Sequence, residues 1–452
     1  MPRSELPPGP RIPATLQLLR YSLSPLAYLE QCAARYGEAF TIRQAGYGTQ
    51  VILWSPQAVR DVFKGDPKVL HAGEANAFLR AAVGPTSVLV VDDQPHARQR
   101  RLLLPPFKGE RMRAFFDAMQ AAVEQELVTW PKDTPIPMLD PMRRITLRVI
   151  AQTVMGLSPG AQLDHFEQCI RRMLAFTRTR HTFVWVKLMP FRLLSGATWL
   201  PYFREARALD VAIYDHIAAM RKRPPDERGT SVLADLLNAT DDTGAELSDP
   251  EIRDALITML IAGHDTTAIG LTWALEQIAS RPDVTERLHA ELECATGGAP
   301  PRADQLDALP YLDATIRESL RLRTIFSFVV RLTKQPFVAG DREYPAGVML
   351  CPCNHLIHRR EDLYPDPQTF RPDRFIERRF AGHEWFPFGG GNRTCLGAGF
   401  ALNQMKITLA TLLARLRLSR PRSAHSAAVR QGVSLAPKDG AVISVHARAD
   451  RM

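Results

Sequence analysis

The feature that most constrains the fold is one long, apolar stretch with a helical pattern. Ser248-Asp249-Pro250-Glu251 has the form of a capping box with an early proline, which fixes the start of a helix. The pattern continues to about Ser280, and at 1.5 Å per residue this makes a rod of roughly 45 Å. Such a helix needs a large domain around it, and a chain of 452 residues is long enough to supply one.

The middle of this helix is weak. Residues 262–267 read Ala-Gly-His-Asp-Thr-Thr. A glycine followed by β-branched polar residues forms helix poorly. Because natural sequences break local rules mainly where function requires it, this segment indicates a site at the centre of the helix.

The rest of the chain predicts further helices between small sheets. Helical spacing extends from about residue 95 to 320. Residues 39–54 predict a hairpin around a Gly-Tyr-Gly turn, and Asp439-Gly440 between apolar runs predicts a second one. We therefore expect a mainly α fold with small β-sheets (α+β).

The chain carries no internal repeat and no long linker. We therefore expect a single domain over residues 1–452, opening with a proline-rich segment at residues 1–10.

Composition excludes several classes of protein. The six cysteines follow no disulfide spacing, and the N-terminus has no signal segment. No apolar run approaches the roughly 18 residues of a spanning helix, so we expect no transmembrane anchor and a cytoplasmic location. The net charge of +9 is spread along the chain, without the basic blocks of a nucleic-acid groove. We therefore expect no nucleic-acid partner.

The strongest chemical signal lies at residues 388–397, which read Phe-Gly-Gly-Gly-Asn-Arg-Thr-Cys-Leu-Gly. The glycines let the backbone approach a flat object closely, and backbone N–H groups can hold the Cys395 sulfur as a thiolate. Arg393 adds a fixed positive charge. A lone cysteine is usually a buried residue in a turn, but this spaced pattern arises by chance in roughly one chain in 10⁴.

This decapeptide resembles the haem-binding loop of the cytochromes P-450, a family with cysteine-ligated haem. The resemblance implies haem b with Cys395 as the axial ligand of the iron, and Gly397 completes the motif. It also implies that Phe388 packs near the haem and the sulfur, and that Arg393 pairs with a haem propionate. The implied fold is a triangular prism with a long central helix over the haem.

Two further elements fit the resemblance. Glu318 and Arg321, three residues apart on a helix, are similar to the family's Glu-x-x-Arg pair, and Arg374 follows at the distance expected for their third partner. We expect a structural role for all three. Asp265 and Thr266 resemble the family's acid–alcohol pair, which implies that they relay protons to dioxygen.

The two propionates require cations, because buried carboxylates are costly without them. His96 and Arg100 lie four residues apart and resemble the His-x-x-x-Arg of many bacterial members. Arg331, ten residues after Arg321, matches another propionate-binding arginine.

The resemblance also places residues around the substrate. Many members have a proline pair soon after Glu-x-x-Arg that is missing here, which leaves the course of residues 322–328 open. The expected pocket is apolar or small and indicates a lipophilic, mostly neutral substrate. An apolar segment at residues 183–191 either guides such ligands, touches a membrane or simply packs. The expected pocket residues are Phe78, Leu79, Val83, Thr258, Ile261, Ala262, Ile325, Phe326, Phe328, Val329 and Leu435.

The resemblance implies redox partners as well. With no fused flavin or iron–sulfur domain, we expect electrons to come from a separate ferredoxin or flavodoxin with its reductase. Basic side chains near the thiolate side of the haem are candidates for docking an acidic partner. They are Arg98, Arg101, Arg111, Arg113 and Lys406.

Together these features predict a bacterial haem-thiolate monooxygenase that inserts one oxygen atom from O2 into a lipophilic small molecule. We favour a terpenoid or steroid as the substrate, with a fatty acid next. Two alternatives are a peroxide-driven oxygenase and a haem-thiolate sensor without turnover. The Asp265–Thr266 pair argues against both, because neither needs a proton relay.

Overall fold

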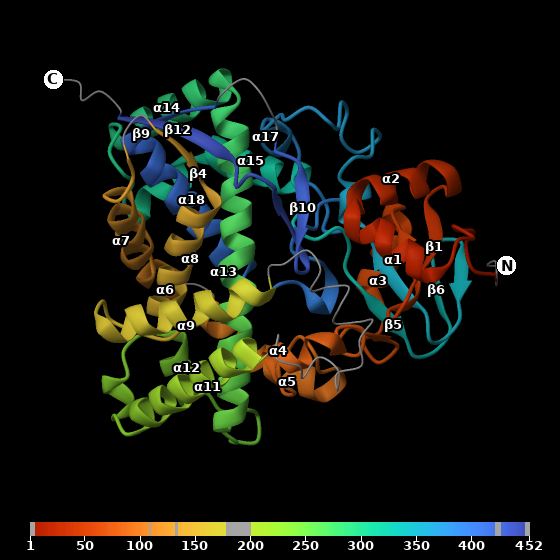
Figure 1. Ribbon diagram of the computed structural model, residues 1–452, viewed down its shortest axis with the longest axis horizontal. Helices are drawn as coiled ribbons and strands as arrows, with labels where there is room; N and C mark the ends of the chain where they lie inside the picture. Colours follow the sequence, from red (N-terminus) through yellow and green to blue (C-terminus); the bar gives the residue numbers. More distant parts are fainter. Residues whose placement is uncertain (1–4, 108–109, 132–133, 178–199, 421–425, 448–452) are drawn as a thin grey trace.

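The computed structural model describes residues 5–107, 110–131, 134–177, 200–420 and 426–447. Helices make up most of the chain, and the longest, α13 (Asp249–Ala279), passes through the middle of the molecule (Figure 1). Helices lie on one side of it, and a sheet with its covering helices lies on the other. The apolar segment predicted at residues 183–191 falls outside the described residues.

Helix α11 (Leu200–Arg221) ends before the proline pair at residues 224–225, and α14 (Pro282–Thr296) ends just before Gly297, whose φ is +64°. The remaining helices are α1 (Ala14–Leu23), α2 (Pro25–Tyr36), α3 (Pro56–Lys64), α4 (Arg80–Val83), α5 (Asp93–Leu103), α6 (Glu110–Ala114), α7 (Phe116–Leu127), α8 (Leu139–Thr153), α9 (Ala161–Thr177), α11 (Leu200–Arg221), α12 (Val232–Asn238), α14 (Pro282–Thr296), α15 (Pro310–Leu322), α16 (Asn354–Ile357), α17 (Arg374–Glu377) and α18 (Ala398–Arg415). Short 3₁₀ helices are η1 (Ala77–Leu79), η2 (Pro105–Phe107), η3 (Pro225–Glu227), η4 (Ala303–Ala308) and η5 (Gly391–Arg393).

The largest sheet has the strand order β1-β2-β8-β5-β3, in which β2 and β8 are parallel and the other neighbours are antiparallel. A second sheet has the order β4-β12-β9, and two hairpins are formed by β6–β7 and β10–β11. The strands are β1 (Ala39–Gln44), β2 (Gly48–Leu53), β3 (Leu70–His71), β4 (Pro135–Pro137), β5 (Arg331–Thr333), β6 (Phe337–Ala339), β7 (Arg342–Tyr344), β8 (Met349–Pro352), β9 (Leu416–Ser419), β10 (Ala428–Gln431), β11 (Ser434–Pro437) and β12 (Val442–Ala447).

Helix α13 begins as the sequence predicted. Glu251 accepts from the backbone N–H of Ser248, which completes the capping box, and the last helical residue stands just before Ser280. By length and composition this helix could cross a membrane, but 67% of its most apolar window is buried inside the protein. It is therefore the core helix of the fold, against which α8, α15 and α18 pack.

Two details differ from the predictions. The sequence places a hairpin at Asp439-Gly440, but the strands on either side belong to different sheets: β11 pairs with β10, whereas β12 pairs with β4 and β9. The chain at this turn instead accepts backbone hydrogen bonds from Met138 and Leu139, at the start of α8. Helix α13 is also unbroken at residues 262–267, so its weak centre does not interrupt it.

Candidate functional site

The cysteine loop is seated against α3 through its glycines. Gly389 and Gly391 have φ values of +70° and +67°, in the left-handed region that favours glycine. A Cβ at Gly390 would overlap the ring of Phe63, and one at Gly391 would overlap its carbonyl oxygen. The close approach that the glycines allow is therefore partly to Phe63, which the sequence did not predict.

Cys395 stands at the end of this loop, just before α18. Its backbone N–H donates to the carbonyl of Phe388 at 3.0 Å, and Arg100 donates to the carbonyl of Thr394 at 2.7 Å. The residue is accessible to solvent, yet enough protein surrounds the sulfur that burial raises the pKa of the thiol. The backbone N–H of Gly397 and the charge of Arg100 act in the opposite direction, because both favour the thiolate.

The four side chains expected to hold propionates come together beside this loop. His96 and Arg100 extend from α5, and Arg331 from β5 donates to the carbonyl of Gly390 at 3.0 Å. Arg393 donates to the carbonyls of Val88 and Val91 at 3.1 and 2.8 Å. Elements far apart in the sequence thus bring their cations to one place.

The electrostatics of this cluster call for an anion. Burial, with the charges of Arg393 and Arg100, lowers the pKa of His96 to about 4. Burial lowers the pKa values of Arg331 and Arg393 to about 10, and neighbouring arginines add to the effect in both cases. The Nε of Arg393 is buried without a hydrogen-bond partner in the described chain. These residues fit a flat group that carries two carboxylates.

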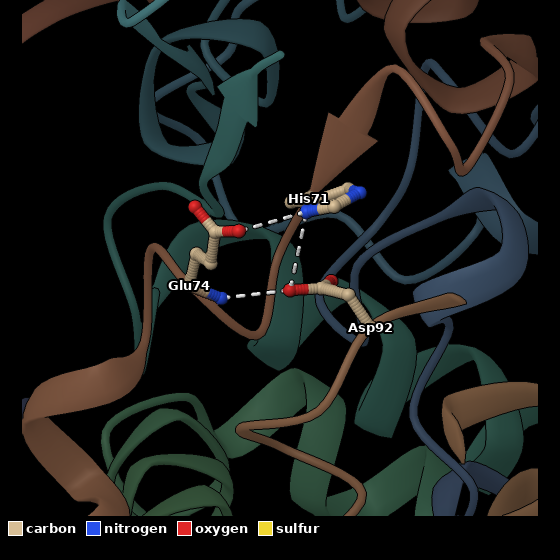
Figure 2. A group of neighbouring side chains, drawn as sticks. All are labelled: His71, Glu74 and Asp92. Carbon is tan, nitrogen blue, oxygen red and sulfur yellow. Dashed lines mark hydrogen bonds and ion pairs between the residues drawn. The ribbon is translucent and has the colours of Figure 1, made fainter. Parts of the chain in front are cut away.

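Asp92 is the carboxylate of this cluster, and no role for it was predicted from the sequence. It pairs with Arg393 at 2.5 Å and accepts the backbone N–H groups of Ala72 and Gly73 at 2.9 Å. With His71 and Glu74 it forms a group whose ligand atoms could surround a metal ion (Figure 2).

The donors around this group argue against a metal ion. Asp92 also accepts the N–H of Glu74 at 2.8 Å, and the Glu74 carboxylate pairs with Lys334 at 2.9 Å. The carboxylate oxygens of Asp92 and Glu74 therefore already face N–H groups and cations. Asp92 thereby holds the Arg393 side chain in place. The only sequence signal for this contact was the polar turn that precedes the helix of His96.

The three residues for which the sequence predicts a structural role lie together. Arg321 and Glu318 form a two-pronged ion pair, with N–O distances of 2.6 and 2.7 Å, and both side chains are fully buried. Arg374 lies 3.4 Å from the same carboxylate. Arg321 also donates to the carbonyls of His358 and Pro367, in the irregular segment that leads to the cysteine loop.

The acid and the alcohol at the centre of α13 have different surroundings. The hydroxyl of Thr266 donates to the carbonyl of Ala262 at 2.5 Å, one turn back. The carboxylate of Asp265 is held by Arg143 of α8, with an Nε–Oδ1 distance of 2.8 Å. Nothing in the local sequence identified Arg143 as a partner.

The expected pocket residues divide into three groups by their exposure. Val83, Thr258 and Leu435 are buried, and the hydroxyl of Thr258 contacts Ser87 at 2.7 Å. Ala262 is exposed. The partly buried members are Phe78, Leu79, Ile261, Ile325, Phe326, Phe328 and Val329.

A thiol at the end of a glycine loop, a cluster of buried cations and a long core helix are the features of a haem-thiolate protein. The chain matches the protein-family model described as cytochrome P450 over residues 6–443. It is 37% identical over 448 residues to putative cytochrome P450 135B1 of Mycobacterium tuberculosis, covering 98% of this chain and 92% of that protein. Putative cytochrome P450 138 of the same organism is 33% identical over 455 residues, covering 99% of this chain and 98% of that protein. The chain therefore belongs to the cytochrome P450 family.

Solved structures confirm the predicted fold class. The heme domain of cytochrome P450DA superimposes with a TM-score of 0.87 at 24% identity, covering 99% of this chain and 98% of that one. Retinoic acid-bound cyanobacterial CYP120A1 superimposes with a TM-score of 0.84 at 24% identity, covering 98% of this chain and 100% of that one. Membership confirms the predicted cofactor and enzyme class: the family carries haem b with an axial cysteine thiolate, and its members are oxidoreductases of the monooxygenase type.

Proposed function

We propose that this P450 inserts one oxygen atom from O2 into a lipophilic small molecule, and that Cys395 is its haem ligand. The observation that carries the assignment of Cys395 is the cluster of His96, Arg100, Arg331 and Arg393 beside its loop, because the two carboxylates of haem b supply the anions that this cluster requires. When bound, the haem thiolate provides the electron density that favours O–O cleavage.

In this proposal, two residues of α13 carry out the proton transfer. Asp265 supplies protons and the hydroxyl of Thr266 passes them on toward dioxygen. In this structure the hydroxyl donates to a backbone carbonyl, and its lone pairs can accept a hydrogen bond from a donor such as water. To pass a proton on, the hydroxyl turns away from that carbonyl, gives its own proton toward dioxygen and takes another from the donor.

We favour a terpenoid or steroid as the substrate, with a fatty acid next. The support is the apolar character of the side chains expected around the substrate, among them Phe78, Ile325 and Phe328. One structural neighbour is described as bound to retinoic acid, an isoprenoid compound, although its 24% identity shows a shared fold alone. The substrate proposal therefore rests on the side chains.

Electrons come from a separate ferredoxin or flavodoxin with its reductase, and the chain works in the cytoplasm. The docking proposal needs revision, because several of the basic side chains already have acidic partners. Arg98 pairs with Asp241 at 2.6 Å, and Lys406 pairs with Asp313 at 3.2 Å. Arg101 is likewise paired with Asp242, whereas Arg113 is exposed and the side chain of Arg111 lies outside the described residues. The attraction for an acidic partner is correspondingly reduced.

Ligand titration tests the substrate proposal. The ferric protein is mixed with sesquiterpenes, steroids and fatty acids while the Soret band is recorded. We expect a saturable shift from low to high spin with isoprenoid or steroid ligands, and a weaker one with fatty acids. Productive ligands should then consume O2 with a ferredoxin system and yield an oxygenated product. If none of the three classes produced a shift, the proposal for the substrate would be wrong.

A further inference from the structure

The acid at the centre of α13 is held on the side of the helix that faces α8. Arg143 and Asp265 are largely shielded from solvent, with side chains 11% and 17% exposed. Their 2.8 Å contact is charge-assisted, and such bonds are stronger than neutral ones. The guanidinium therefore fixes the direction of the carboxylate.

This contact belongs to a tight seam between the two helices. One turn along α8, the hydroxyl of Thr146 lies 3.0 Å from Nδ1 of His264. A Cβ on Gly263 would come within 2.9 Å of the Ile150 side chain, so the glycine lets α8 approach closely. The Cβ position of Gly263 therefore faces α8. The close packing leaves Arg143 little freedom of its own.

The same guanidinium reaches the β10–β11 hairpin. The Nη2 of Arg143 donates to Oε1 of Gln431 at 2.8 Å, and Gln431 is the last residue of β10. Across the turn, the backbone N–H of Leu435 donates to the carbonyl of Ile325 at 2.8 Å. Leu435 and Ile325 both belong to the expected substrate lining. Arg143 thus connects the acid on α13 with a hairpin beside the substrate.

We propose that Arg143 is a positioning residue that couples the β10–β11 hairpin to the proton-supplying acid Asp265. While Gln431 and Asp265 share the guanidinium, the carboxylate is held toward α8. A substrate that contacts the hairpin shifts Gln431 and Arg143, and the released carboxylate then takes up a proton from solvent water and passes it on to Thr266. This inference rests on the proposed role of Asp265 as the proton source.

Three variants separate this role from simple packing. Arg143→Gln removes the charge, and Gln431→Leu removes only the hairpin side of the link. Asp140→Asn is the matched control, because Asp140 touches the same guanidinium at 3.3 Å but is 71% exposed. The charged and titratable neighbours of Asp265 include Arg143 and Asp140 on α8 and His264 on α13 itself.

The first readout needs no turnover. The holoprotein is labelled with carboxyl-¹³C aspartate, and the infrared spectrum of Asp265→Asn is subtracted to isolate the band of Asp265. We expect the protonated carboxyl band to appear at higher pH in Arg143→Gln than in the parent, because loss of a nearby cation favours the neutral acid. Asp140→Asn should leave the transition close to that of the parent. Identical transitions in the parent and Arg143→Gln would overturn the positioning role.

The second readout is the fraction of consumed electrons that appears in product. We expect this fraction to fall about tenfold in Arg143→Gln, with an increased solvent isotope effect, because a misplaced proton donor loses much of its contribution. Gln431→Leu should also lower the fraction of electrons that appears in product. It should shift the pH at which the protonated Asp265 band appears by less than Arg143→Gln does. Unchanged coupling in Gln431→Leu would overturn the hairpin link.

Two controls keep the outcomes distinct. If Asp265→Asn itself leaves product formation intact, the proposed function of Asp265 fails, while the infrared transition still decides whether Arg143 positions it. If Arg143→Gln does not fold, Arg143→Lys replaces it, since lysine keeps the charge but cannot bond to both partners in a fork. We expect that variant to lose coupling with a nearly normal infrared transition, and full coupling in it would overturn the link.

Discussion

Replacing Glu318 by glutamine should destabilise the fold far more than the same change at an exposed ion pair. Glu318 is fully buried and contacts Arg321 through both oxygens, and it also accepts the backbone N–H of Arg371 at 2.9 Å. The change to an amide keeps the shape of the side chain but leaves the guanidinium charges of Arg321 and Arg374 buried without their anion.

The structure allows the size of the effect to be estimated. Leaving one charge of a buried pair without its partner costs about 3–5 kcal/mol. An unfolding entropy of about 2.1 cal/mol/K per residue amounts to about 0.9 kcal/mol/K for 452 residues that unfold together. We therefore expect the melting temperature of Glu318→Gln to fall by about 3–5 °C.

Glu124→Gln provides the matched control. Glu124 pairs with Arg415 at 3.1 Å, but the two side chains are 36% and 54% exposed. Exposed pairs contribute about 0.2–1 kcal/mol, which corresponds to about 1 °C or less. Both variants are measured by circular dichroism melting with haem content determined in parallel. Equal melting temperatures for the two variants would refute the claim that the buried network holds the fold together.

Three further predictions concern the haem-binding region. Arg331→Leu should lower haem retention about 10- to 100-fold through loss of a charge-assisted bond; equal haem dissociation rates for the variant and the parent would contradict this. In the haem-free chain, the pKa of His96 is lowered to about 4 from 6.5. Its contribution to the free energy of unfolding is therefore complete above pH 6.5 and is lost as the pH falls toward about 4. Urea unfolding across this range should show the free energy of unfolding falling with pH, and His96→Gln should abolish this pH dependence. Gly390→Ala should impair haem incorporation because its Cβ would overlap Phe63, whereas Gly399→Ala, with nothing within 4 Å, should incorporate haem normally, as pyridine haemochrome assays can establish.

Features encoded by neighbouring residues could be predicted from the sequence. The start of α13 depends on contacts among Ser248, Pro250 and Glu251, all within one turn, and the structure begins the helix there. The hairpin at Asp439-Gly440 was predicted by the same kind of local rule and is wrong, because β12 finds better partners in β4 and β9. Turn residues show that the chain reverses, but they do not determine which strand pairs with which.

The partners of the candidate site residues could not be predicted in this way. Arg143 is 122 positions from Asp265 and 288 from Gln431, so no spacing rule connects them. The pairing of the basic side chains could not be predicted for the same reason, since the ion pair that Arg98 makes with Asp241 joins residues 143 positions apart. A single sequence shows which charges exist, but only the folded chain shows which of them are already balanced.

Arginines also explain how the irregular segment before the cysteine loop keeps its shape. Between α16 and α18 the described chain has few backbone ladders, so many carbonyl groups need other donors. Arg321 donates to the carbonyls of His358 and Pro367, and Arg331 donates to that of Gly390. A guanidinium offers five N–H donors in a rigid fork, which one lysine ammonium cannot replace. Part of the positive charge of the chain therefore lies inside the protein. There the guanidinium groups donate to backbone carbonyls and are also available to the carboxylates of haem.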